Sequence, residues 1–450
     1  MRVIEPATET LLAEVAEASV EDADRAVARA KAAYPAWRAV SPGDRAKLLR
    51  RFANAVAGDA GKLAELEARN VGKPISDARG EVGMVVDVFN YYAGAPERLL
   101  GNTIPVAGGV DMTFREPLGV VALIVPWNFP IAITSWKLGP ALAAGNTVVL
   151  KPAALTPMTA LELEHLAVKA GIPEGVFKVV VGAGRTVGER LVQHPDVAKV
   201  AFTGSTEVGR RIGALAADSI KRVTLELGGK SANIVFADAD IDRAAASAPG
   251  AVFGNAGQDC CARSRILVER SVVERFMQAL ETAIKKLRVG DPMDEKTEMG
   301  PLISADHRSK VATYLEDGAK VAIRGSAPSG AGFWFPPTVL SPVAPTDRAA
   351  REEIFGPIVA VIPFSDEADA IRIANDTVYG LSGSIWTNNA GRAMRVARAL
   401  ETGTISINSN TSVRVTTPFG GFKQSGIGRE LGPNALDHYT ELKNVFLSTT

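Results

Sequence analysis

The chain has 450 residues, which is too long for a single hydrophobic core and predicts two or three structural units. Its 50 basic and 50 acidic side chains cancel, so the net charge gives no general attraction to nucleic acid or to an anionic membrane surface. Hydrophobic residues make up 46% of the chain, with 42 glycines and 26 prolines, which is typical of a globular α/β protein with many tight turns.

No segment has the pattern of a secretory signal or of a membrane span. Glu5 and Pro6 interrupt the N-terminal stretch at once, and the longest apolar run, Val120–Val125, is too short to cross a bilayer. The only two cysteines, Cys260 and Cys261, are adjacent and cannot form an ordinary loop-closing disulfide. These features predict a soluble, cytoplasmic protein.

Residues 19–70 are rich in Ala, Arg and Glu with helical spacing. Ser19 and Asp22 form a plausible capping box, which predicts an amphipathic helix to about Ala33. A second helix is predicted over about Asp44–Ala57. We expect this region to supply packing and no chemistry.

A β-hairpin is predicted between residues 101 and 119. Ile104–Val106 and Val110–Phe114 are short β-like runs on either side of two glycines. A hairpin inserted between a helical and an α/β region often serves as an assembly arm.

From Val120 onward, strand-like and helix-like runs alternate, which predicts a parallel sheet covered on both faces. The strand-like runs are Val120–Val125, Thr147–Lys151, Phe177–Val181, Lys199–Phe202 and Arg222–Glu226. The helix-like runs between them are Ile133–Ala144, Met158–Ala170, Val187–Gln193 and Glu207–Ala217. A second α/β unit is predicted from about residue 227, with strands at Ala232–Phe236, Ile266–Val268, Val359–Phe364 and Gly383–Trp386. The chain ends with a Gly-rich segment, Thr417–Gly432, and a β-like tail, Lys443–Ser448.

The carboxyl end of each of the first five strands carries residues able to contact a ligand, and parallel sheets bind their ligands at this edge. These residues are Pro126-Trp127-Asn128, Lys151-Pro152-Ala153, Gly182-Ala183-Gly184, Thr203-Gly204-Ser205 and Glu226. Gly204–Gly209 opens a helix directly after a strand, where free backbone N–H groups could bind a pyrophosphate or simply form a tight turn. Lys151 could bind ribose hydroxyls or a phosphate, or be solvated.

Four residues form a candidate set for acyl chemistry. Glu226 ends an apolar strand, where loss of water raises the pKa of a carboxyl group toward that of a general base, although an exposed acid is the alternative. Cys260 and Cys261 lie in a loop between regular elements, so either could be a nucleophile, or both could be small buried hydrophobes. The Asn128 amide could stabilise an oxyanion.

The histidines and cysteines give no sign of a metal site. All four histidines are expected to lie in polar or helical settings away from these motifs, which makes a Cys–His dyad improbable: His165, His194, His307 and His438. Because no Cys/His cluster has zinc spacing, no metal is predicted.

The chain contains seven short motifs: Pro126-Trp127-Asn128-Phe129-Pro130, Lys151-Pro152-Ala153, Phe202-Thr203-Gly204-Ser205-Thr206, Leu225-Glu226-Leu227-Gly228-Gly229-Lys230, Gly257-Gln258-Asp259-Cys260, Glu352-Glu353-Ile354-Phe355-Gly356-Pro357 and Pro418-Phe419-Gly420-Gly421-Phe422-Lys423. Their order is that of the NAD(P)-dependent aldehyde dehydrogenases, which the chain resembles over nearly its whole length. The resemblance implies an α/β fold with a Rossmann-type cofactor domain (residues 1–100 and 120–227), an α/β catalytic domain (228–424) and a small β oligomerisation arm (101–119 and 425–450). A homodimer or homotetramer follows by analogy.

The resemblance also implies a role for individual residues. Cys260 is the nucleophile in Gly-Gln-x-Cys, and the Asn128 amide and the Cys260 backbone N–H hold the oxyanion. Glu226 activates the water that hydrolyses the thioester. Lys137 and Glu430 match a proton relay behind that glutamate. A CoA-acylating relative and a silent nucleotide-binding member are the alternatives, and Glu226 speaks against the first.

NAD is the implied cofactor, with NADP possible. The implied contacts are Val125, Pro126, Trp127, Lys151, Ala153, Ala154, Gly184, Phe202, Thr203, Gly204, Ser205, Val208, Leu227, Gly228, Glu353 and Phe355. NAD-preferring relatives often carry Glu three residues after the lysine, whereas this chain has Ala154. The change removes a contact that favours NAD and a repulsion against the 2′-phosphate of NADP.

The resemblance implies an apolar and aromatic substrate tunnel lined by Phe129, Trp136, Phe253, Asp259, Cys261, Val413 and Phe419. Asp259 and Arg414 could add charge near its mouth or be solvated. Relatives of the succinate-semialdehyde type tend to carry Arg where Trp136 stands, so we expect a small-molecule aldehyde of broad aliphatic, aromatic or amino-aldehyde type.

Overall fold

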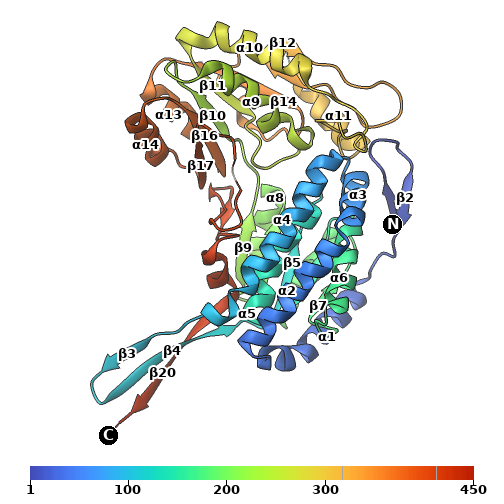
Figure 1. Ribbon diagram of the computed structural model, residues 1–450, viewed down its shortest axis with the longest axis vertical. Coiled ribbons are helices and arrows are strands. Elements are labelled where there is room, and N and C mark those ends of the chain that lie inside the picture. Colours follow the sequence, from blue (N-terminus) through green and yellow to red (C-terminus); the bar gives the residue numbers. More distant parts are fainter. Residues whose placement is uncertain (317, 412, 450) are drawn as a thin grey trace.

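Two α/β domains and a projecting arm make up the chain (Figure 1). The computed structural model describes residues 1–316, 318–411 and 413–449. One domain is built on a six-stranded sheet, the other on a seven-stranded sheet, and the arm is a three-stranded sheet. No helix within the described ranges is both long and apolar enough to cross a membrane.

Four helices form the N-terminal layer: α1 (Val20–Ala39), α2 (Pro42–Gly58), α3 (Ala60–Val71) and α4 (Ile75–Ala93). The predicted capping box is confirmed, because the Ser19 side chain accepts from the Asp22 N–H and the Asp22 side chain accepts from the Ser19 N–H. Helix α1 runs past the predicted end at Ala33, through Pro35, and thereby buries Trp37.

The six-stranded sheet has the order β19-β9-β8-β5-β6-β7. Its strands are β5 (Val120–Ile124), β6 (Thr147–Lys151), β7 (Phe177–Val179), β8 (Val197–Thr203), β9 (Arg222–Glu226) and β19 (Gly426–Ile427). The five predicted strands pair in parallel, and β19 pairs antiparallel with β9. The helices are α5 (Pro130–Ala144), α6 (Met158–Lys169), α7 (Glu189–Gln193) and α8 (Thr206–Ala217).

Successive residues of β5 face opposite sides of this sheet. Val121 and Leu123 pack in one cluster with helices α2, α4, α5 and α6, whereas Val120 and Ala122 pack in another with α1, α7 and α8. Burial on both sides explains why these strands read as near-continuous apolar runs in the sequence. The predicted ligand residues follow or end these strands at the carboxyl edge of the sheet.

The seven-stranded sheet has the order β12-β13-β14-β11-β10-β16-β17. The four predicted strands form its parallel centre: β10 (Ala232–Val235), β11 (Arg265–Glu269), β14 (Ile358–Phe364) and β16 (Ser382–Trp386). Three strands were not predicted: β12 (Val321–Arg324), β13 (Thr338–Leu340) and β17 (Thr404–Ile407). The helices are α9 (Ile241–Phe253), α10 (Val273–Lys286), α11 (Ala305–Ala312), α12 (Arg348–Arg351), α13 (Glu367–Asn375) and α14 (Ala390–Ala399).

The arm confirms the predicted hairpin and C-terminal strand. Strand β3 (Thr103–Val106) pairs with β4 (Gly109–Pro117), and β20 (Thr440–Ser448) pairs with the other edge of β4. The arm extends away from both domains and ends near the C-terminus (Figure 1). Strand β19 lies within the segment 425–450, which the sequence assigns to the arm, but it extends the six-stranded sheet. It thereby brings Glu430, three residues after the strand, close enough to Glu226 for its charge to act on that carboxyl group.

Candidate active site

The loop between α9 and β11 holds the two cysteines in an unusual backbone conformation. Asn255, Ala256 and Gly257 all have positive φ angles, of 49°, 54° and 72°. Non-glycine residues adopt this region only where surrounding contacts enforce it. Such backbone strain is typical of functional loops.

Side chains of the same loop supply those contacts. The Gln258 Nε2 donates to the Asn255 carbonyl at 3.0 Å, and Gln258 Oε1 accepts from the Ile303 N–H at 2.9 Å. The Asn255 Nδ2 donates to the Asn128 carbonyl at 2.9 Å. Hydrogen bonds therefore hold the loop internally, to Ile303 of the seven-stranded domain, and to the segment that follows β5.

Asn128 lies beside the cysteine loop, as an oxyanion donor must. Its side chain is 3% exposed, and its Nδ2 donates to the Gln258 carbonyl at 2.9 Å. Its backbone carbonyl accepts from Asn255 and, at 2.9 Å, from the Lys73 ammonium. Hydrogen bonds therefore hold both the side-chain amide and the backbone carbonyl of Asn128.

The two thiols have different surroundings. Cys260 is half-buried and lines a cavity of about 230 Å³, whereas Cys261 is buried at 6% exposure and does not line it. The hydrogen bond with Cys261, together with burial, raises the pKa of the Cys260 thiol well above its ordinary range. The Asp259 carboxylate and the two sulfur atoms lie within 4.8 Å of one another. Cys260 is the sulfur that faces open space.

Glu226 is a buried carboxyl group. It is 3% exposed, and neither of its side-chain oxygens has a hydrogen-bond partner among the described residues. Burial, and then the charge of Glu430, raise its pKa well above the ordinary value. Gly420 makes room for it, since a Cβ there would lie 2.7 Å from Glu226 Oε1. The strand-end position therefore produces a carboxyl group with the character of a base.

A buried ion pair lies behind Glu226. The Lys137 ammonium donates to Glu430 Oε1 at 2.5 Å, and both side chains are at most 2% exposed. Lys137 comes from α5, and Glu430 is held by a backbone bridge to Phe419. The two predicted relay residues are brought together, although they are 293 positions apart in the chain.

The cavity at Cys260 opens along the carboxyl ends of β5, β8 and β9. Predicted residues make up most of its lining: Pro126, Trp127, Asn128, Thr203, Gly204, Ser205, Leu227, Gly228, Cys260, Glu353 and Phe355. Glu353 Oε1 accepts from the Gly229 N–H at 2.9 Å, and burial raises the pKa of Glu353 to about 7. A Cβ on Gly229 would lie 2.3 Å from the Cys260 carbonyl oxygen, so this glycine allows the cysteine loop to approach the end of β9 closely.

His307 and Lys310, which were not predicted as site residues, also line this cavity. The His307 ring packs edge-to-face on Trp127, with centroids 5.4 Å apart, and its Nε2 bonds the Phe355 carbonyl at 2.7 Å. The expectation that His307 lies away from the motifs is wrong. It comes from α11, an element that was not predicted, and nothing in the local sequence links it to Phe355.

The remaining predicted cofactor residues lie outside the lining of this cavity: Val125, Lys151, Ala153, Ala154, Gly184, Phe202 and Val208. Ser205 caps α8 by accepting from the Val208 N–H, and the same residue lines the cavity, which places the positive end of that helix beside it. Lys151 is buried, and burial lowers its pKa to about 8. This edge of the sheet therefore brings together Lys151, the N-terminus of α8 and Glu353.

The model of the aldehyde dehydrogenase family matches residues 1–445. The chain belongs to the aldehyde dehydrogenase family. It is 44% identical to an aldehyde dehydrogenase of Emericella nidulans, covering 99% of this chain and 91% of that relative. It is 41% identical to the betaine aldehyde dehydrogenase of Bacillus subtilis, covering 99% and 94%. The solved structure of PnpE of Pseudomonas sp. WBC-3 with nicotinamide adenine dinucleotide has a TM-score of 0.97 at 45% identity, covering 100% of this chain and 94% of PnpE.

These comparisons confirm the predicted family and the aldehyde dehydrogenase type of α/β fold. Within that fold, most residues predicted to line the substrate tunnel pack in one apolar cluster: Trp136, Cys261, Phe419, Phe129 and Val413. Trp136 and Phe419 meet edge-to-face at 5.3 Å. Phe253 does not join them, because it is buried in the core of the seven-stranded domain. Arg414 is exposed, and Asp259 accepts from the Cys261 N–H.

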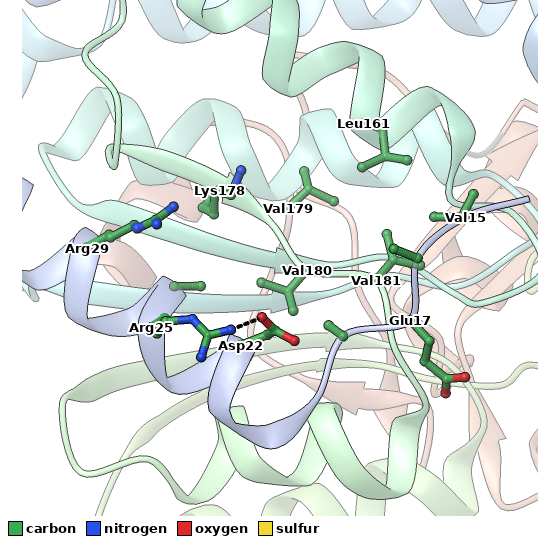
Figure 2. Close-up of a pocket in the computed structure, with 13 residues that line it drawn as sticks. Val15, Glu17, Asp22, Arg25, Arg29, Leu161, Lys178, Val179, Val180 and Val181 are labelled. Atoms are coloured by element: carbon green, nitrogen blue, oxygen red, sulfur yellow. Dashed lines mark hydrogen bonds and ion pairs between the residues drawn. The ribbon is translucent and has the colours of Figure 1, made fainter. Parts of the chain in front are cut away.

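A larger hollow, of about 460 Å³, lies elsewhere in the fold, between the start of α1 and β7. Figure 2 shows that its lining combines Val179, Val180 and Val181 with the ion pair of Asp22 and Arg25. None of the residues predicted for catalysis, cofactor or substrate lines this hollow. It is open, and its lining is partly charged.

Proposed function

We propose that this family member oxidises an aldehyde to the corresponding carboxylic acid with NAD(P)+ as the hydride acceptor. The observation that carries the proposal is the setting of Cys260. Its thiol opens into the cavity that Glu353 and Phe355 line, beside the Asn128 amide. The buried, unpartnered Glu226 supplies a base for the second half of the reaction. In this proposal the six-stranded domain binds the cofactor and the seven-stranded domain supplies the nucleophile.

In the first half-reaction the Cys260 thiol, whose pKa is raised, gives its proton to a water molecule linked to a carboxylate, and the resulting thiolate adds to the aldehyde carbon while the carbonyl oxygen becomes an oxyanion. The Asn128 Nδ2 and the Cys260 backbone N–H donate to that oxygen. Glu353, Phe355, Ser205 and Lys151 would hold the dinucleotide, whose nicotinamide ring, when bound, accepts the hydride from the adduct. Loss of the hydride leaves a thioester on Cys260.

In the second half-reaction Glu226 takes a proton from a water molecule that attacks the thioester carbon. The carboxylic acid leaves, and the Cys260 sulfur is restored. The raised pKa of Glu226 suits a group that must accept a proton near neutral pH. The buried pair of Lys137 and Glu430 supports a route by which that proton leaves the site.

Product analysis with and without coenzyme A tests the proposal. We expect one carboxylic acid for each reduced nicotinamide formed, with the same yield in both conditions. An acyl-CoA product would identify CoA as the acyl acceptor and remove the role of Glu226. A complete lack of nicotinamide reduction across aliphatic, aromatic and amino-aldehydes with both cofactors would leave only a silent nucleotide-binding member.

NAD leads over NADP as the proposed cofactor, and the NAD complex of the related PnpE supports it. Ala154→Glu places a carboxylate three residues after Lys151, where it repels a 2′-phosphate. We expect kcat/KM for NADP to fall roughly tenfold relative to NAD, about 1.4 kcal/mol. Ala154→Gln, which has similar size but no charge, should change the ratio little. An unaltered ratio in Ala154→Glu would place the adenosine ribose elsewhere.

We propose that the arm joins subunits by extending a neighbour's sheet. Strand β20 carries three apolar side chains that are more than half exposed: Leu442, Phe446 and Leu447. Light scattering should give a homodimer or homotetramer. The double variant Leu442→Lys and Phe446→Lys should shift the particle toward the monomer. A monomeric wild-type protein would refute the arm's role.

A further inference from the structure

A buried lysine connects the N-terminal helical layer to the proposed oxyanion donor. Lys73 lies in the short link between α3 and α4 and is 1% exposed. Its ammonium donates to Glu81 Oε1 at 2.5 Å and to the Asn128 backbone carbonyl at 2.9 Å. It also lies over the Phe129 ring, 4.2 Å from the centroid. The ammonium thus meets a carboxylate, a carbonyl and an aromatic face.

Burial of an ammonium is unfavourable unless its hydrogens are satisfied. Glu81 alone could neutralise the charge, but the second hydrogen bond goes to the backbone of the loop that carries Asn128. The cation over Phe129 fixes the next residue of the same loop. Two of the three contacts of Lys73 are therefore contacts to the segment after β5.

The helical layer also holds the other end of this loop. Glu67, on α3, is fully buried and accepts from the Ile131 N–H at 3.1 Å and from the Thr159 hydroxyl at 2.7 Å. The segment from Asn128 to Ile131 is thus fixed at its first residue by Lys73 and at its last by Glu67. Neither contact belongs to the strand pairing of the six-stranded sheet, because β5 ends at Ile124.

The hydrogen bond to the Asn128 carbonyl fixes the backbone conformation of this residue, and that conformation determines where its side-chain amide lies. In the structure that amide already donates to the Gln258 carbonyl at 2.9 Å, two residues before Cys260. An oxyanion donor must lie within a few tenths of an ångström of its place, because a misplacement of about 1 Å costs on the order of a hundredfold in rate. A loop without the Lys73 contact would keep its donor but lose this precision.

We propose that Lys73, with Glu81 as its counter-ion, is a positioning residue that holds the Asn128 amide for the oxyanion formed on Cys260. The inference rests on the proposed aldehyde oxidation. Lys73 faces four acidic groups, on α3, on α4 and in the cysteine loop: Glu67, Asp77, Glu81 and Asp259. Its charge favours the ionised form of each of them, and through Asn128 it acts on the oxyanion formed during acylation, the step that formation of reduced nicotinamide reports.

Single-turnover kinetics of Lys73→Met test the proposal, with enzyme in excess over aldehyde and reduced nicotinamide measured by absorbance. We expect the rate to fall by about ten- to a hundredfold, the range for a displaced donor. The dissociation constant for NAD should stay within about twofold, because Lys73 does not line the cofactor cavity. Lys62→Met removes an exposed lysine of α3 that pairs with Glu162, and its rate should equal that of the wild type.

A double-mutant cycle with Asn128→Ala separates positioning from general stability. Lys73→Met should slow the wild-type background and add little once the amide is gone. An equal loss in both backgrounds, or no loss in the wild type, would overturn the proposal. If Lys73→Met does not fold, Glu81→Gln enters the same cycle with the same expected non-additivity. A wild-type protein that reduces no nicotinamide would instead refute the proposed function itself.

Discussion

Cys260→Ala is expected to abolish aldehyde oxidation, with a loss of at least about 10⁴-fold in kcat, as for removal of other catalytic nucleophiles. The reason is geometric. Cys260 is the sulfur that lines the cavity with Asn128 and Glu353, whereas Cys261 is buried against the apolar cluster. Cys261→Ala removes a buried neighbour and leaves the reacting atom, so most of the turnover should remain.

Steady-state formation of reduced nicotinamide measures both variants. NAD binding and thermal midpoints should be close to those of the wild type in each, which separates loss of chemistry from loss of fold. The opposite pattern, with Cys261→Ala silent and Cys260→Ala active, would mean that the wrong sulfur is assigned.

Glu226→Gln is expected to stop the reaction after its first half. The amide keeps the shape of the side chain but cannot accept a proton from water, so hydrolysis of the thioester should slow by about a hundredfold or more. Stopped-flow absorbance should then show a burst of one reduced nicotinamide per site, followed by a slow steady rate.

The pH dependence of the same step follows from the environment of Glu226. The base must be deprotonated, and burial raises its pKa, so the deacylation rate of the wild type should rise with pH at values well above the ordinary range of a carboxyl group. The rise should be absent in Glu226→Gln. If Glu226→Gln kept the steady-state turnover of the wild type, Glu226 would not be the general base.

The sequence was most informative where physical constraints are local. The five parallel strands of the first domain were predicted because strands buried on both faces form near-continuous apolar runs, as Val120–Ile124 and the middle of Thr147–Lys151 do. The topology of such a sheet then places the carboxyl ends of its strands at one edge. That rule predicted that Asn128 and Glu226 follow strands at the same edge of the sheet.

Contacts between distant elements could not be predicted in the same way. His307 meets Phe355 across 48 positions, and Lys73 meets Asn128 across 55. Each is an ordinary polar residue in its local sequence, and only the packing of α11 and of the α3–α4 link turns it toward the site. Likewise β12 has four residues of which one is buried, so it is too short and too exposed to carry the pattern of a central strand.

The mass of the peptide that contains Cys260 tests the central claim most directly. Glu226→Gln, mixed with NAD and an aldehyde and then quenched in acid, should carry one acyl group per subunit as a thioester. Fragment masses should place that group on Cys260, and hydroxylamine should remove it. An unmodified peptide after a full burst of reduced nicotinamide, or an acyl group on Cys261, would contradict the mechanism.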